Sequence, residues 1–154
     1  MIEKDGKRFN CCESVTIKVH EKHPLNGFGV GVMRAISNMG GGGAGWGSIC
    51  GAVSGGVMAF GLAMGTEGNE SPDEFTAIRD KMRTHTQEFL KAFEDKWGHI
   101  NCFELLGADT RTSEGKAKHE ANKAKGIYYC EDFVQWVADK VLEVFEEKSI
   151  KPLT

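Results

Sequence analysis

The chain has 154 residues, of which 40 % are hydrophobic and 27 % charged, and its formal net charge is −3. This length suits one domain with a single core, and the composition is ordinary for a water-soluble globular protein. Nucleic-acid binding calls for a basic face, which a net negative charge and mostly scattered Lys and Arg do not provide. We therefore predict a single domain over residues 1–154 that binds neither nucleic acid nor membrane.

The first ten residues, MIEKDGKRFN, lack the apolar stretch of a secretory signal, and a cytoplasmic location is expected. In a reducing compartment the five cysteines are not expected to form a disulfide framework. They are interpreted as buried thiols, metal ligands or redox thiols.

Helix signals begin at Asn10, a good N-cap residue, and predict a helix over 11–22 that ends before Pro24 and Gly27. The segment 30–40 is a shorter helix candidate with Gly40 as its stop signal. No stretch alternates convincingly between apolar and polar residues, as a half-buried strand would.

Residues 40–65 contain eleven glycines and no charge. A membrane span is disfavoured because the first part is mostly glycine, the apolar part is short, and no basic cluster or aromatic belt flanks it. A buried central helix is favoured, since small residues recur every fourth position and form a ridge that lets two helices approach closely. The ridge consists of Gly47, Gly51, Gly55, Ala59 and Ala63. It suits a tight crossing in the core or at a subunit interface, and a homodimer is expected.

The segment 71–98 carries the clearest helix pattern, with Ser71 as N-cap, Pro72 at the first position, Glu74 completing a capping box and Gly98 as stop. Its apolar stripe is interpreted as core. The stripe consists of Phe75, Ile78, Met82, Phe89, Phe93 and Trp97.

After this helix, residues 101–107 predict a short helix with Asn101 as N-cap and Gly107 as C-cap. Residues 108–126 are polar and are interpreted as a mobile loop with at most a helical turn. A final helix follows, with a buried stripe of Cys130, Val134, Val137, Val141 and Phe145. The predicted fold is all-α: a bundle of about five helices around the glycine-rich helix.

Four cysteines share a placement near predicted helix N-termini: Cys11, Cys50, Cys102 and Cys130. Free N–H groups and the helix dipole favour thiolate there, which metal ligation and reactive-thiol chemistry both need. The alternative is that they are inert buried residues, since cysteine often behaves as a small hydrophobe. No CxxC pair is present, so any shared site must be assembled by the fold.

The other candidate motifs are weak. The histidines are interpreted as surface or capping residues, and His99 is the one to watch because it lies three residues before Cys102. The glycine run lacks the Lys of a phosphate-binding loop, and no strand is predicted before it, so nucleotide binding is disfavoured.

The order of cysteines resembles the redox-active family named for its C_GCAxxG_C_C pattern, which has a related domain in split-Soret cytochromes. The matching segments are FNCCESV, GGGGAGWGSICGAVSGGVMAFGL, WGHINCFELLG and YYCEDFV, which contain the four cysteines in order. Two departures stand out. The centre reads Cys50-Gly51-Ala52, whereas the family pattern places glycine before cysteine, and Cys12 is an additional cysteine that is as suitable a ligand as Cys11. Haem attachment does not carry over, because no CxxCH is present.

The resemblance implies redox activity by cysteine, and the leading hypothesis is an electron-transfer protein with an iron–sulfur cluster. Cys11, Cys50, Cys102 and Cys130 would hold a [2Fe–2S] or [4Fe–4S] cluster, and the backbone at Gly47, Gly51 and Gly55 would approach it. A redox partner protein of unknown identity is implied. The alternatives are a thiol–disulfide protein with Cys50 as nucleophile, or a structural zinc module with four cysteine ligands.

Overall fold

The structure is a computed structural model that describes residues 1–154, and it consists of seven α-helices and one small β-hairpin. The helices are α1 (Cys11–Lys22), α2 (Val30–Ile36), α3 (Gly51–Met64), α4 (Pro72–Trp97), α5 (Cys102–Leu106), α6 (Ser113–Ala124) and α7 (Tyr129–Glu147). The hairpin pairs β1 (Glu3–Lys4) with β2 (Lys7–Arg8) in antiparallel fashion. The all-α prediction is confirmed, with seven helices where about five were expected.

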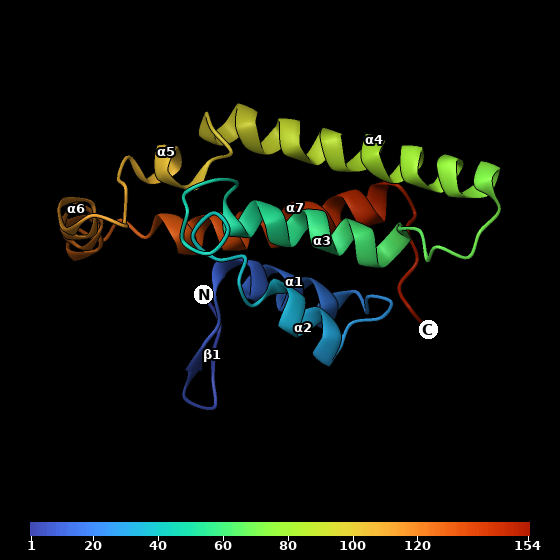
Figure 1. The fold of residues 1–154 in the computed structure, drawn as a ribbon, viewed down its shortest axis with the longest axis horizontal. Coiled ribbons are helices and arrows are strands. Elements are labelled where there is room, and N and C mark those ends of the chain that lie inside the picture. Colours follow the sequence, from blue (N-terminus) through green and yellow to red (C-terminus); the bar gives the residue numbers. More distant parts are fainter.

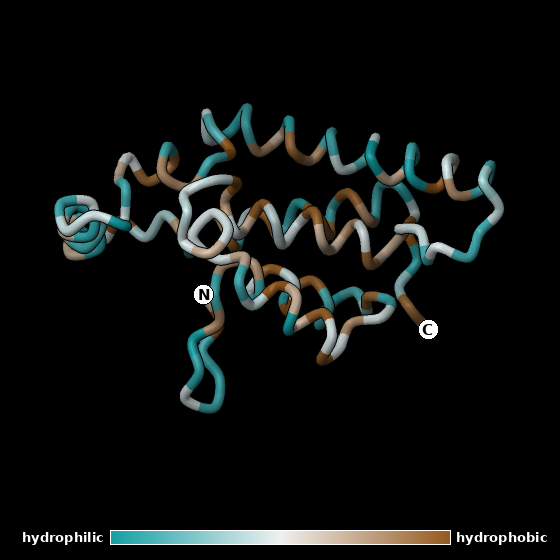
Figure 2. The backbone as a smooth tube through the Cα atoms, viewed as in Figure 1, coloured by the Kyte–Doolittle hydropathy of each residue, from teal (hydrophilic) through white to brown (hydrophobic).

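The glycine-rich helix α3 lies at the centre of the bundle, as predicted (Figure 1). It packs against α1, α4 and α7, and α1 also packs against α7. The backbone coloured by hydropathy shows α3 as mostly apolar and α6 and the hairpin as mostly hydrophilic (Figure 2). Because α3 meets neighbours on several sides, its nearly uniform hydrophobicity is explained by burial. None of the seven helices combines the length and hydrophobicity that crossing a membrane requires.

The two strongest N-terminal signals of the sequence are confirmed as capping boxes. The Glu13 amide donates to Asn10 Oδ1 over 2.9 Å, and the Asn10 amide donates to Glu13 Oε2 over 2.7 Å. Ser71 and Glu74 exchange the same pair of bonds at the start of α4. Each box satisfies amides that a helix N-terminus would otherwise leave without partners, and so fixes where the helix begins.

The glycine ridge is a core contact of one chain. A Cβ atom at position 55 would lie 2.7 Å from Val15 Cβ and 2.8 Å from the Cys12 carbonyl oxygen, so only glycine allows α1 to lie this close to α3. On another side of α3, a Cβ at Gly56 would lie 2.6 Å from the Phe89 ring. The ridge is thus used inside the bundle, and the homodimer stays a prediction.

The core is built on aromatic rings from three helices. Phe60 of α3 meets Phe145 of α7 edge to face with ring centroids 5.2 Å apart, and it also meets Phe89 of α4 at 5.8 Å. These rings are at most 1 % exposed. The stripe predicted for α4 is correct for its C-terminal half only. Its N-terminal members Phe75, Ile78 and Met82 are half-buried, because no further element covers that part of the helix.

Two elements differ from the expectations. The interpretation of residues 108–126 as a loop is wrong, because Ser113–Ala124 form the three-turn helix α6. The Gly115 amide donates a 2.9 Å hydrogen bond to the Thr112 hydroxyl, which caps this helix. The sequence also gave no convincing strand, yet residues 3–8 form the hairpin, with Asp5 and Gly6 in the left-handed region at its turn. Both elements are too polar to leave a clear hydrophobic periodicity, which was the signal used to find elements.

Candidate cysteine site

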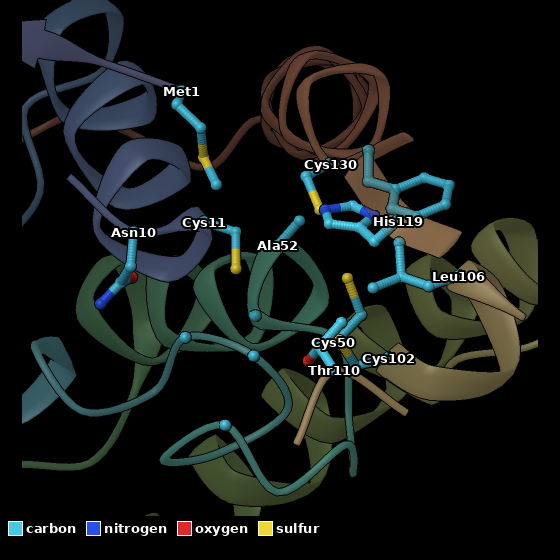
Figure 3. A pocket seen from close by; sticks show the side chains of 15 residues that line it. Met1, Asn10, Cys11, Cys50, Ala52, Cys102, Leu106, Thr110, His119 and Cys130 are labelled. Carbon is cyan, nitrogen blue, oxygen red and sulfur yellow. The ribbon is translucent and has the colours of Figure 1, made fainter. Parts of the chain in front are cut away.

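Four helix N-termini meet at one end of the bundle and bring four cysteines together. Cys11 and Cys102 are the first residues of α1 and α5, Cys50 is the N-cap of α3, and Cys130 is the second residue of α7. All four line one cavity of about 370 Å³. The sticks of Cys11, Cys50 and Cys130 extend toward a common space in Figure 3. The predicted placement at helix N-termini is confirmed, and the fold assembles residues that lie far apart in the sequence.

Cys50 and Cys102 are held side by side by backbone hydrogen bonds. The Cys50 amide donates to the Ile100 carbonyl over 2.8 Å, and the Cys102 amide donates to the Ser48 carbonyl over 2.7 Å. These bonds flank an isolated antiparallel bridge between Ile49 and Asn101. The starts of α3 and α5 are therefore joined through main-chain groups, which fixes the backbone positions of the two cysteines relative to each other.

The glycine run before Cys50 forms a tight hydrogen-bonded loop. Five of its glycines have a positive φ, which residues with a side chain rarely adopt. They are Gly41, Gly42, Gly43, Gly45 and Gly47. The loop closes on itself, with the Gly45 amide donating to Gly40 over 3.0 Å and the Gly47 amide donating to Gly41 over 2.9 Å. Gly40, Gly41 and Gly45 form part of the cavity wall. The run is thus an ordered wall beside Cys50.

The structure separates Cys11 from its neighbour Cys12. Cys11 lines the cavity, whereas Cys12 is fully buried and does not line it. The Cys12 carbonyl accepts a 2.8 Å hydrogen bond from Thr16 within α1. Consecutive residues of a helix point about 100° apart, so only one of the two can face the cavity. Of the two candidates that the sequence left open, Cys11 is the one positioned at the site.

The three glycines predicted to approach a cofactor lie in different places. Gly51 lines the cavity, and a Cβ atom there would collide with Cys11 Sγ, so its missing side chain leaves room for that sulfur. Gly55 packs against α1 as described above. Gly47 lies beneath the Phe103 ring, which a Cβ would strike. Neither Gly47 nor Gly55 lines the cavity, whose glycine wall is supplied by the loop and Gly51.

Burial keeps the thiols protonated when no metal is present. It raises the pKa of Cys50 and of Cys130 to about 12 and that of Cys102 to about 11, and the neighbouring Cys11 adds to each rise. The amides of Val53 and Ala52 at the start of α3 lower the pKa of Cys50, but by less than burial raises it. For Cys50, Cys102 and Cys130, the expectation that the helix N-termini would favour free thiolates is therefore wrong, because desolvation outweighs the helix N-terminus.

The donor atoms of the cavity do not form a ready-made site for a single ion. No three Cys, His, Asp or Glu side chains are grouped so that they could hold one metal ion. All five cysteines are free thiols. The cavity nevertheless contains one imidazole that the sequence did not single out, that of His119 on α6. His99, the histidine chosen from the sequence, lies outside the cavity and pairs with Glu104 over 2.7 Å on the surface.

Recognising His119 from the sequence would have required recognising α6. The segment contains a usable start signal, Thr112, and a stop signal, Gly126. On a helix, Gly115 and His119 are four residues apart and share a face. The buried Gly115 marks the inward side of α6, so His119 follows on that side.

The profile of one protein family, described as "Putative redox-active protein (C_GCAxxG_C_C)", matches residues 9–144. The chain belongs to this family. The match spans all seven helices in whole or in part and includes all four cysteines of the cavity. No curated protein and no solved structure matches the chain. The resemblance inferred from the cysteine segments is confirmed, and redox activity is the function class that the family description supports.

Proposed function

We propose that this protein transfers electrons through an iron–sulfur cluster held by Cys11, Cys50, Cys102 and Cys130. The observation that carries the proposal is the meeting of these four cysteines, from four separate segments, around one cavity. Four thiolates are the usual ligand set of [2Fe–2S] and [4Fe–4S] clusters. The family description adds redox activity as the function class.

The room in the cavity favours a cluster over a single zinc ion. Zinc–sulfur bonds are about 2.3 Å long, which places the four sulfurs of a tetrahedral site only about 3.8 Å apart. No three donors of this cavity are grouped closely enough to hold one ion. A cluster of several iron and sulfide atoms needs more room than one ion, and the cavity of about 370 Å³ that the four cysteines line provides room.

The protonation of the thiols argues against the thiol–disulfide alternative. The nucleophile in disulfide exchange is the thiolate, and a pKa of about 12 leaves almost none of Cys50 in that form at neutral pH. A metal centre meets no such obstacle, because metal binding itself displaces the thiol protons. We infer that Cys50 is a ligand rather than a nucleophile.

The residues around the thiols would do three things for a bound cluster. The main-chain bonds between Ser48 and Cys102 and between Cys50 and Ile100 hold two ligands in place. Ala52, Leu106 and Phe133 line the cavity and would give a bound cluster apolar contacts. The amides at the start of α3 are placed to donate to sulfur, and such bonds tune the potential. When bound, the cluster supplies a centre that accepts one electron from a carrier protein and passes it on.

The test is anaerobic purification or reconstitution of the full chain with ferrous iron and sulfide. The expected result is a brown protein with iron and acid-labile sulfide in cluster stoichiometry and a reversible one-electron reduction. The Cys50→Ala variant is expected to lose the cluster, whereas Cys12→Ala, the matched control outside the cavity, keeps it. A colourless wild-type protein that resists reconstitution would overturn the proposal. A zinc content of one per chain with no redox signal would support the structural zinc alternative.

A further inference from the structure

His119 brings an imidazole to a cavity whose lining contains four cysteines, apolar residues, glycines, Asn10 and Thr110. It is the only histidine in the lining, and its imidazole extends from α6 toward the space near Cys130 in Figure 3. Helix α6 lies in the chain between Cys102 of α5 and Cys130 of α7. The residue therefore belongs to the segment that connects two of the four proposed ligands.

Helix α6 is fixed beside the cavity by contacts at its N-terminal end. Gly115 packs so closely on the Asp109 main chain that any side chain would collide with it. The Thr112 hydroxyl caps the helix by accepting from Gly115, and Lys118 donates a 2.6 Å hydrogen bond to the Gly107 carbonyl. His119 lies one turn beyond Gly115 on the same face. Its position is therefore set by the docking of α6.

The Nδ1 atom of His119 is buried and has no hydrogen-bond partner. Buried polar atoms are nearly always hydrogen-bonded, because leaving one without a partner costs about 1–3 kcal/mol. Three other side-chain nitrogens share this condition: His23 Nε2, His85 Nδ1 and Trp97 Nε1. None of their residues lines the cysteine cavity. His119 is thus the only one of the four residues that lines the cavity, and because its Nδ1 has almost no accessible surface, a group bound there would meet the other edge of the ring.

We propose that the imidazole of His119 donates a hydrogen bond to a sulfur atom of the cluster and thereby raises its reduction potential. This inference rests on the proposed function. Four cysteines already fill the usual ligand count, which leaves the imidazole as a hydrogen-bond donor rather than a ligand. When the centre gains one electron, negative charge builds up on its sulfur atoms, and a donor aimed at one of them stabilises the reduced form more than the oxidised form.

The experiment compares the reconstituted full-length wild type with two variants, using dithionite as the one-electron reductant in a potentiometric titration. His119→Leu removes the donor and keeps an apolar side chain, so its potential is expected to shift downward with iron and sulfide per chain unchanged. His119→Gln keeps an N–H group, and its reduction potential is expected to lie between those of the wild type and His119→Leu. His85→Leu is the matched control, since it removes an imidazole with an unpartnered buried Nδ1 on α4, and it should leave the potential unchanged.

A measurement on the wild type keeps the inference testable if a His119 variant fails to fold, which circular dichroism would reveal. With ¹⁵N-labelled histidine, pulsed electron paramagnetic resonance of the reduced protein should show weak nitrogen coupling, as a hydrogen bond to sulfur produces. Strong coupling, or loss of iron in His119→Leu, would identify a ligand and overturn the donor role. An unchanged potential in His119→Leu would also overturn it while leaving the cluster proposal intact. A wild type that binds no cluster overturns both.

Discussion

The aromatic core and the cysteine cavity are built on the same helices but are filled in opposite ways. Phe60, Phe89 and Phe145 close the core completely, with rings that are at most 1 % exposed. At the N-terminal end of α3, small residues such as Gly51 and Ala52 replace these rings, and about 370 Å³ stays open between the thiols. The comparison teaches that the bundle derives its stability from one region and holds its candidate chemistry in another.

The largest expected effect separates the two adjacent cysteines. Cys11→Ala removes a thiol that lines the cavity and should abolish cluster assembly. Cys12→Ala should keep the cluster and cost roughly 1–2 kcal/mol, because it removes a fully buried sulfur from the packed interior. Iron content and chemical denaturation of both variants check this. Cluster assembly in Cys11→Ala together with its loss in Cys12→Ala would reverse our assignment of the ligand.

Truncation of the core should affect stability alone. Phe89→Ala is expected to destabilise the protein by about 3–5 kcal/mol, because Phe89 is completely buried between α3 and α4. Protein that remains folded should still bind iron in the wild-type ratio. Phe75→Ala, on the half-buried part of the same helix, is the control and should cost clearly less. Equal losses in the two variants would show that α4 packs more evenly than described.

Two glycines of the ridge should respond differently. Gly55→Ala forces α1 away from α3 at Val15 and should cost roughly 1–3 kcal/mol, with cluster binding retained and the molecular mass unchanged. Gly51→Ala pushes on Cys11 Sγ and should reduce iron uptake. Gly61→Ala, where the added methyl group meets open space, should raise stability by up to about 1 kcal/mol. Denaturation curves, iron content and light scattering measure these outcomes, and a change of oligomeric state in Gly55→Ala would place the ridge at a subunit interface.

An effect confined to alkaline pH is a pH dependence of stability that comes from the buried thiols. In the metal-free protein the pKa of Cys50 is raised from 9.0 to about 12, so the folded state holds this proton more tightly than the unfolded state. The resulting stability is fully present below pH 9 and is lost as the pH rises from 9 to 12. Urea denaturation at several pH values should show this decline, with a shallower slope in Cys50→Ala. An identical slope in the variant would contradict the raised pKa.

Metal binding should release protons from the thiols whose pKa is raised. Cys50, Cys102 and Cys130 all have a raised pKa and are protonated at neutral pH, so their ligation releases three protons from these residues. Calorimetry in buffers of different ionisation enthalpy counts them. The aromatic core has no such protons to release, so proton release on metal binding distinguishes the cysteine cavity from the core.

Much of the fold could be predicted because its signals are local. Capping boxes at Asn10 and Ser71, and the stop at Gly98, depend on a few adjacent residues and were confirmed. Helix α6 was missed because it buries little more than Gly115 and therefore has no apolar stripe. The half-buried start of α4 could not be anticipated either, since its periodicity is that of a core helix and the absence of a covering element is a tertiary property.

The candidate site was predictable in its cysteines and not in their environment. The order of Cys11, Cys50, Cys102 and Cys130 in the chain and their nearness to helix starts were sufficient to group them. The direction of their pKa shifts could not be predicted from the sequence. The position at a helix N-terminus is a local property, whereas desolvation depends on what packs around each sulfur. His119 was missed for the same reason, since only the docking of α6 brings it to the cavity.

The pairing of α1 with α7 has a consequence for how the protein is made. Cys11 on α1 is synthesised well before Cys130 on α7, and α7 also packs against α1 and α3. On the ribosome, a chain that has not yet reached α7 lacks both the fourth thiol and a cover for its core. Contacts between such distant segments form late, so the complete set of thiols arises together with the finished fold. Under our proposal, a cluster that needs all four thiols would therefore be loaded only after α7 has been made and packed against α1 and α3.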